Sequence, residues 1–379
     1  MAWMDFNRDG EVNVAEELLS LDTVSLEKMC VDSIELVKYA RNSAARKVNV
    51  VQTMTYYCIG KWIVDEQQKG EKRAKYGKQI LKHLSDRMNA EFGKGFSVDT
   101  LENMRKFYLV YENRISDNLY RNFAIEKSEK ASRILDEEKP FLLSWSHYVK
   151  LMRIENETER NFYELESIKN NWSLPELKRQ FGSALFERIA LSTDKESVKL
   201  LAEKGHVVSQ ASDLVKDPYV LEFLGIEEKE KYSETELENR ILDNLQKFLL
   251  ELGTGFTFVA RQKRFTFDEE HFRVDLVCYN RLLRCFVLFD LKIGELKHQD
   301  LGQMQMYVNY YDRYEKTEDE NPTIGVLLCN EKKDALVELT LPKDSNIYAS
   351  KYQLYLPDKK LLKEKLQEWL QEEREIEGK

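Results

Sequence analysis

The sequence predicts an α+β protein in which an all-helical N-terminal half precedes an α/β domain. From about residue 25 to residue 200, apolar residues recur every three or four positions, which places them on one face of a helix. After about residue 230, short runs rich in Val, Phe and Leu follow one another between polar turns, as is typical of strands. This change of period indicates a boundary between two structural classes.

Four segments are predicted along the 379 residues. Residues 1–24 form an acidic leader and residues 25–200 form the helical domain. A charged connector over residues 201–232 leads to the second domain, residues 233–379. The chain is long enough for each of the two domains to bury its own core.

The second domain has a predicted order of elements. Ser233 and Glu236 form a capping box that begins a helix, and Gly253 ends it. Three strands follow in FTFVARQKRFTF, FRVDLVCYN and CFVLFDLK, and then a helix in HQDLGQMQMYVNYYDRY. The short apolar run TIGVLLC is typical of a strand buried on both faces. The order is therefore α-β-β-β-α-β.

Composition excludes several classes of protein. The formal charge of -9 argues against a chain that simply coats nucleic acid, although a local basic face can still bind phosphate. No run approaches the roughly 18 apolar residues of a membrane span, and the first residues lack a secretion signal. The five scattered cysteines show no zinc or redox spacing. We expect a cytoplasmic protein that does not bind membranes.

Two of the predicted strands carry ionisable residues. Side chains alternate along a strand, so Asp290 and Lys292 share one face, and a hairpin brings Asp275 close to Asp290. Two clustered carboxylates repel each other unless a cation lies between them, and Mg²⁺ or Mn²⁺ prefers such oxygen ligands. The pattern favours phosphodiester hydrolysis. The alternative is a solvated ion pair at the edge of a sheet.

These residues resemble a known family. Asp275, followed by Asp290-Leu291-Lys292 within α-β-β-β-α-β order, resembles the PD-(D/E)XK nuclease superfamily with its restriction-endonuclease-like core. LENRILDNLQKFLLELGTGFTFVARQKRF, GQMQMYVNYYD and ENPTIGVLLC are similar to segments of the YhcG-like bacterial nucleases. The resemblance extends from about residue 35 to 355. It implies a winged-helix-like domain in the N-terminal half.

The resemblance also implies roles for the site residues. Asp275 and Asp290 are the implied metal ligands, with the Leu291 carbonyl as a third, and Lys292 positions or activates water. Mg²⁺ or Mn²⁺ is the implied cofactor. The chain has Asp290 where this branch usually has the longer Glu, which puts the activity in doubt more than the fold.

Three further residues are implied at the site. Glu238 on the first helix matches an acid that many members of the superfamily add to the metal site. Gln303 and Tyr307 are similar to the Gln-x-x-x-Tyr motif of RecB-like members. Alternatively, Glu238 is an exposed residue paired with an arginine, Gln303 satisfies backbone groups, and Tyr307 belongs to the core.

The helical half carries a candidate DNA-binding surface. Asn103, Arg105 and Lys106 lie on the helix after the turn GKGFS and contact DNA if this turn belongs to a helix-turn-helix. The alternative is a surface that binds protein. Cutting of both DNA strands is easiest for a dimer, so a homodimer is also considered.

The leader contains a calcium-loop pattern. In DFNRDGEVNVAE, Asp5, Asn7, Asp9 and Glu16 fit the spacing of an EF-hand-like loop. Too few residues precede it for an entering helix, so the prediction is a weak Ca²⁺ site, and the alternative is a disordered acidic leader.

The sequence thus favours a metal-dependent endonuclease that hydrolyses DNA in DNA processing, recombination or defence. The competing hypothesis is a catalytically inactive DNA- or protein-binding accessory factor of a restriction or defence system.

Overall fold

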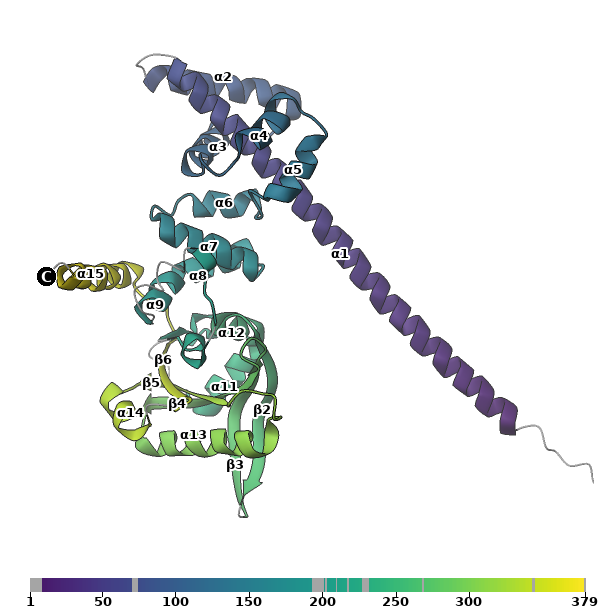
Figure 1. Ribbon diagram of the computed structural model, residues 1–379, viewed down its shortest axis with the longest axis vertical. Coiled ribbons are helices and arrows are strands. Elements are labelled where there is room, and N and C mark those ends of the chain that lie inside the picture. The colour runs from purple at the N-terminus through teal and green to yellow at the C-terminus, as the bar shows by residue number, and fades with distance from the viewer. Residues whose placement is uncertain are drawn as a thin grey trace, which may run out of the picture. The chain divides into compact units, whose positions relative to one another are not determined.

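The chain folds into two compact units, Met1–Arg153 and Ile154–Lys379, which are described separately. Figure 1 shows the elements of the computed structural model. The structure describes residues 9–69, 74–192, 201, 203–208, 210–216, 218–226, 232–267, 269–342 and 345–377.

Unit 1 is helical throughout its described residues. Its elements are α1 (Asp9–Lys69), α2 (Ala74–Phe92), α3 (Val98–Val110), α4 (Asp117–Tyr120), η1 (Arg121–Ile125), α5 (Lys130–Glu138) and α6 (Trp145–Leu151). α1 begins inside the segment predicted as a leader. No strand, and hence no β-wing, lies among the residues of unit 1 that the structure describes.

The core of unit 1 forms where α1 and α3 cross. Met104 and Phe107 of α3 are fully buried, and the Phe107 ring packs against that of Tyr57 on α1. The two helices approach so closely at Gly60 that a β-carbon there would lie 2.1 Å from the Met104 carbonyl oxygen. Only glycine allows this approach without a shift of the helices.

Unit 2 contains helices and one sheet. Before the predicted α/β domain it has α7 (Glu157–Lys169), α8 (Leu174–Gly182), α9 (Leu185–Ser192), η2 (Ala211–Leu214), β1 (Tyr219–Val220) and η3 (Glu222–Leu224). The elements that follow are α11 (Glu234–Asp243), α12 (Leu245–Leu252), β2 (Phe256–Phe267), β3 (Glu270–Asn280), β4 (Cys285–Glu295), α13 (His298–Tyr310), η4 (Tyr311–Glu315), β5 (Ile324–Glu331), α14 (Asp334–Thr340), β6 (Ile347–Gln353) and α15 (Lys359–Glu377).

The sheet is mixed, with the strand order β1-β6-β5-β4-β3-β2. β2, β3 and β4 pair antiparallel, whereas β4, β5, β6 and β1 pair parallel. The predicted succession of three strands, a helix and a strand is therefore present. The single helix predicted before them is divided at Asn244 into α11 and α12.

Helices cover both faces of this sheet. Phe289 and Leu291 of β4 belong to a core cluster with Leu237 of α11 and Phe248 of α12. Leu288, the residue before Phe289, belongs to a second cluster with residues of α13. The alternation along β4 thus separates one hydrophobic layer from the other.

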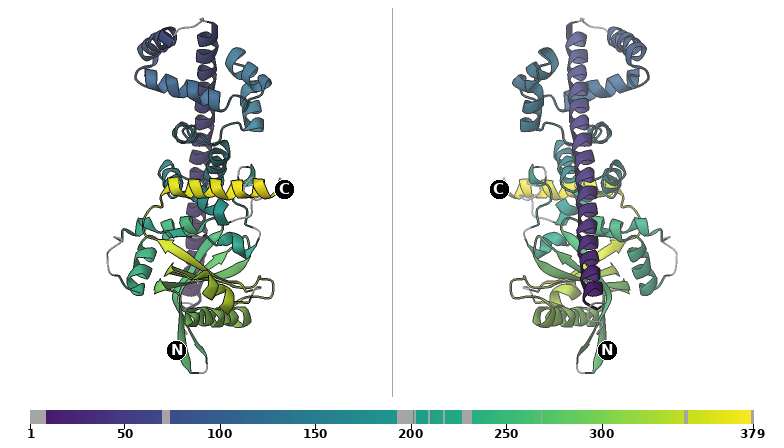
Figure 2. Two further views of the ribbon diagram at one scale, coloured as in Figure 1. Left: turned by 90° about the vertical axis from the view of Figure 1, so that its left-hand side faces the viewer. Right: turned by 90° about the vertical axis from the view of Figure 1, so that its right-hand side faces the viewer.

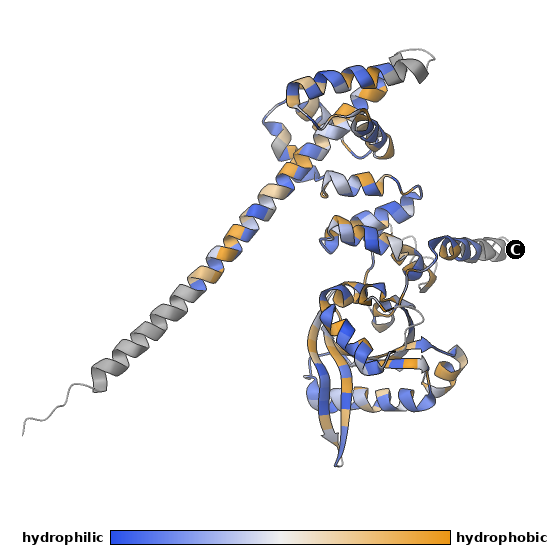
Figure 3. Cartoon of the chain, turned by 180° about the vertical axis from the view of Figure 1, so that it is seen from behind, coloured by the Kyte–Doolittle hydropathy of each residue, from blue (hydrophilic) through white to orange (hydrophobic). Residues whose placement is uncertain are grey.

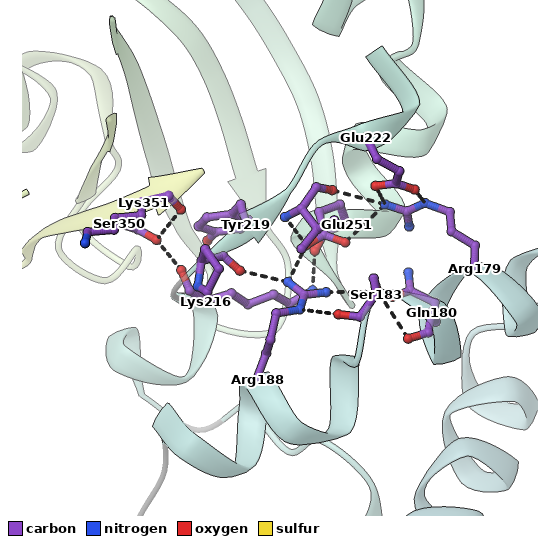
Figure 4. A network of polar contacts seen from close by, with 12 residues as sticks. Arg179, Gln180, Ser183, Arg188, Lys216, Tyr219, Glu222, Glu251, Ser350 and Lys351 are labelled. Atoms are coloured by element: carbon purple, nitrogen blue, oxygen red, sulfur yellow. Dashed lines mark hydrogen bonds and ion pairs between the residues drawn. The ribbon is translucent and has the colours of Figure 1, made fainter. Parts of the chain in front are cut away.

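A buried ionic network joins α8, α9 and α12 to the sheet edge at β1 (Figure 4). Glu251 of α12 accepts hydrogen bonds from Arg188 at 2.7 Å and from the Val220 amide at 3.0 Å. Arg179 lies 3.3 Å from the same carboxylate. The predicted connector therefore contributes β1 to the sheet.

None of the described helices combines the length and the apolar character that crossing a bilayer requires.

Candidate active site

The three residues Asp275, Asp290 and Lys292 come together where β3 and β4 leave their shared ladder. The ladder ends with the pair Leu276 and Phe289, so Asp275 and Asp290 occupy the next position on each strand. Leu288 faces α13, and alternation therefore turns Asp290 and Lys292 toward the same layer.

Asp290 is a buried acid with a perturbed pKa. Its side chain is 4 % exposed, and its Oδ2 lies 2.7 Å from the Lys292 Nζ. Burial raises the pKa of Asp290 to about 7, the charge of Asp275 acts in the same direction, and the Lys292 ammonium opposes both. The solvated surface pair considered above is therefore excluded, because both partners are largely covered.

Asp275 is held by two hydrogen bonds from neighbouring strands. Its Oδ2 accepts from the Leu291 amide at 2.8 Å, and its Oδ1 accepts from Gln262 Nε2 at 2.9 Å. Gln262 also donates to Glu238 Oε2 at 2.8 Å and so bridges the two acids. Sequence analysis missed Gln262, whose only signal is its place on β2 opposite Asp275, visible once the strands are paired.

Glu238 reaches this cluster from α11. Ser233 begins this helix by accepting the Glu236 amide at 3.1 Å, and Leu237 and Ile241 bury one of its faces. Glu238 is only 5 % exposed, and burial and then the charge of Asp275 raise its pKa. It is thus a buried neighbour of Asp275 rather than an exposed helix residue.

Gln303 and Tyr307 lie on α13, on the side of the sheet that Asp290 faces. Gln303 Nε2 donates to the Tyr307 hydroxyl at 2.7 Å. Tyr307 is 1 % exposed and packs in the core layer. Burial raises its pKa, and the charges of Asp290 and Asp275 add to this effect. Tyr307 therefore belongs to the core and also borders the acids.

The oxygen atoms of the cluster suit a hard divalent cation. Glu238 Oε1 and Asp290 Oδ2 are buried and accept no hydrogen bond from any described residue, although Lys292 lies beside the second. Mg²⁺ and Mn²⁺ prefer carboxylate and carbonyl oxygens. No group of three or more His, Cys, Asp or Glu side chains in the described part of the chain is arranged to hold a metal as it stands. The donor chemistry fits, but Asp275 and Asp290 form a pair rather than a complete ligand set.

Comparison with known proteins identifies the family of this chain. The model of the YhcG PDDEXK nuclease domain matches residues 212–368, and that of the DUF1016 N-terminal domain matches residues 32–188. YhcG of Escherichia coli (strain K12), described as a candidate nuclease, is 38% identical over 347 residues, which are 88% of this chain and 91% of that protein. The chain belongs to the YhcG family. The resemblance to YhcG-like nucleases is thus confirmed.

The match to the YhcG nuclease domain contains all residues of the candidate active site, from Glu238 to Tyr307. Two solved structures show weaker likeness. A repair endonuclease from Pyrococcus abyssi has 22% identity and a TM-score of 0.24, and a complex of EndoMS with double-stranded DNA has 18% identity and a TM-score of 0.23. Each match covers 35% of this chain and 50% of the other.

The DUF1016 domain of this YhcG-family chain contains the predicted DNA-binding residues on α3. Ser97 caps this helix by accepting the Thr100 amide at 3.2 Å. Lys106 is exposed, whereas Asn103 and Arg105 are half-buried. Arg105 donates to Gln67 of α1 at 3.2 Å, so its guanidinium is already engaged within unit 1.

The predicted calcium loop lies before the YhcG-family domains. Asp5 and Asn7 are outside the described residues. Asp9 and Glu16 fall within the backbone of α1, and their side chains are also outside the described part. The calcium site stays a prediction.

Proposed function

We propose that the protein is a divalent-metal-dependent endonuclease that hydrolyses phosphodiester bonds of DNA in a processing, recombination or defence role. The observation that carries the proposal is the burial of Asp290 against Asp275 with the Lys292 ammonium 2.7 Å away. Placing two acids and a cation inside a sheet is costly, and acids with strongly shifted pKa values cluster at functional sites.

Asp275 and Asp290 would hold Mg²⁺ or Mn²⁺. A bound divalent cation supplies positive charge at the phosphate and makes water more acidic. The rigid hydrogen bonds from Leu291 and Gln262 hold the Asp275 carboxylate in one orientation before substrate arrives.

Lys292 is suited to donate hydrogen bonds rather than to remove a proton. Burial lowers its pKa, but the charge and hydrogen bond of Asp290, together with the charges of Glu234 and Asp275, outweigh burial and raise the pKa above its ordinary value. The ammonium therefore stays protonated at neutral pH. It can orient the attacking water or stabilise the charge that develops on the phosphate.

In the same proposal, the helical unit binds DNA. The turn at residues 93–97 between α2 and α3 gives this region the connectivity of a helix-turn-helix, which supports a role in DNA binding without a wing among the described residues. Lys106 is the exposed basic residue of the predicted set. A homodimer would place two sites on opposite strands of a duplex.

A second candidate function is that of a catalytically inactive binding factor. It is favoured by the internal pairing of the acids: Gln262 bridges Glu238 and Asp275, and Lys292 neutralises Asp290. The shorter Asp290, in place of the usual Glu, points in the same direction.

Cleavage assays separate the two candidates. We expect purified protein to cut linear, circular or branched DNA with Mg²⁺ or Mn²⁺ and not with a chelator. Asp290→Asn and Lys292→Ala should each reduce the rate by about 100-fold or more. Glu295→Gln is a matched control, because Glu295 lies on the same strand but pairs with the exposed Lys333.

Equal cleavage by wild type and Asp290→Asn would indicate a contaminating nuclease and remove the support for this site. DNA binding by the wild type without cleavage under any metal condition would favour the binding factor.

A further inference from the structure

The β2–β3 hairpin extends beyond the rest of the sheet. β3 pairs with β4 only over residues 276–280, so residues 270–275 pair with β2 alone. The tip of the hairpin projects past α13 in Figures 1 and 2. Three basic residues lie on this projecting part, Lys263, Arg264 and Arg273, and Arg261 lies next to it.

Two of these residues face each other across the hairpin. Arg264 and Arg273 are directly opposite in the ladder, and both are exposed. Neither they nor Lys263 forms an ion pair with any residue that the structure describes. Like charges directly opposite destabilise a strand pair. The projecting part also carries the exposed Glu269 and Glu270, but no ion pair within the described residues offsets the charges of Arg264 and Arg273.

The hairpin packs against α13. Phe265 is 5 % exposed and stacks on Tyr310 with ring centres 4.0 Å apart and on its cross-strand partner Phe272 at 5.5 Å. Hydrophobic and hydrophilic residues are interspersed along these strands (Figure 3), and in β3 they alternate from Phe272 to Asp275. Because Phe265 and Phe272 face α13, alternation turns Arg264 and Arg273 away from it. The two guanidinium groups thus lie on the face of the hairpin opposite to the one that packs against α13.

The basic positions are adjacent to the acids in the same strands. Gln262, which holds both Asp275 and Glu238, lies two residues from Arg264 on β2. Arg273 lies two residues from Asp275 on β3. Two residues along a strand span about 7 Å, which is comparable with two base-pair steps of a DNA strand, each of about 3.4 Å.

We propose that Arg264 and Arg273 are positioning residues that bind backbone phosphates of the substrate DNA next to the phosphate that is cleaved. This inference rests on the proposed nuclease function. Arginine suits the role because its planar guanidinium can donate two parallel hydrogen bonds to a phosphate. The bound phosphates would also offset the repulsion between the two side chains.

The test compares two double variants with the same loss of charge. Arg264→Gln/Arg273→Gln changes the hairpin. Lys247→Gln/Arg281→Gln, at exposed positions on α12 and at the opposite end of β3, is the control. Dissociation constants for a labelled duplex are measured by fluorescence anisotropy with EDTA at several salt concentrations, and kcat and KM are measured with Mg²⁺.

The hairpin variant should bind more weakly, and the slope of log Kd against log salt should fall by roughly 2, since each lost phosphate contact removes about 0.9. Its KM should rise more than its kcat falls. The urea midpoint should be equal or higher, because a repulsion is removed, so weaker binding cannot be attributed to unfolding. The control should match the wild type.

A hairpin variant with the slope and Kd of the control would overturn the inference while leaving the nuclease proposal intact. If the wild type binds DNA but does not cut it, a reduced slope still supports the hairpin contact and only the catalytic proposal fails. No binding of DNA by the wild type would overturn both.

Discussion

Replacing Glu251 by Gln should strongly destabilise unit 2. Glu251 and Arg188 are both fully buried, and their charged atoms are 2.7 Å apart. The substitution keeps the size of the side chain but leaves the Arg188 charge without its counter-ion. Removing one partner of a buried pair usually costs about 3–5 kcal/mol.

The pKa of Glu251 gives an independent value for the free energy that this carboxylate contributes to the stability of unit 2. Burial would raise this pKa, but the charges of Arg188, Lys216 and Arg179 outweigh it and lower the pKa from 4.5 to about 2. At about 1.4 kcal/mol for each pKa unit, the ionised carboxylate contributes roughly 3 kcal/mol. Because the folded pKa is lowered, this stabilisation is complete above about pH 4.5 and is lost as the pH falls through about 2.

The assay is urea denaturation followed by hydrogen–deuterium exchange, so that peptides of unit 2 are observed by themselves. At pH 7 we expect Glu251→Gln to lower the free energy of unfolding by about 3 kcal/mol. The difference from wild type should shrink when the pH is lowered toward 3. Glu236→Gln is the matched control, because Glu236 pairs with Arg240 at a partly exposed position and should cost about 0.5 kcal/mol at most.

A loss no larger than that of the control would refute the reasoning, since it would mean that the buried pair contributes no more than a surface pair. A difference that is unchanged between pH 7 and pH 3 would refute the lowered pKa.

Three further predictions concern other parts of the chain. Gly60→Ala should destabilise unit 1 by about 1–3 kcal/mol, because the new methyl group would lie 2.1 Å from a carbonyl oxygen of α3. The control Gly302→Ala, whose new methyl group would have no atom within 4 Å, should be neutral or stabilising. A urea midpoint of Gly60→Ala equal to that of the wild type would contradict the close approach of the helices. Ser97→Ala should cost about 1 kcal/mol by thermal unfolding, since the Thr100 amide loses its acceptor. With the pKa of Asp290 raised to about 7 by burial and by Asp275, a cation must displace a proton below that pH. The affinity for Mg²⁺, measured by calorimetry, should then fall up to roughly tenfold per pH unit below about 7, and an affinity independent of pH would argue against Asp290 as a ligand.

Much of the nuclease domain could be predicted because its signals are local. The apolar run CFVLFDLK predicts a strand, along which side chains alternate and place Asp290 and Lys292 on one face, and the short turn before Cys285 makes β3 and β4 a hairpin. These features depend on residues close together in the chain. They are sufficient to predict that Asp275 and Asp290 lie on neighbouring strands.

Other features depend on segments far apart in sequence. The bridge from Gln262 to Glu238 spans 24 residues and depends on an irregular position of β2, where Gln262 has φ 45°. Arg105 has the composition of a DNA-binding residue, yet it donates to Gln67, which is 38 residues away. Neither partner can be identified from the spacing of apolar residues.

The sequence by itself determined the order of helices and strands in the second domain and the faces on which the acids lie, because these follow from short-range periodicity. It also indicated the family, through the resemblance of its segments to YhcG-like nucleases. Only the tertiary structure decided which charges are buried. In the sequence, nothing distinguishes Glu251 from an exposed helix acid. In the structure, its side chain is 0 % exposed and lies between Arg179 of α8 and Arg188 of α9. Burial and electrostatic partners arise when distant segments pack together, and they decide whether a carboxylate has an ordinary pKa or a strongly shifted one.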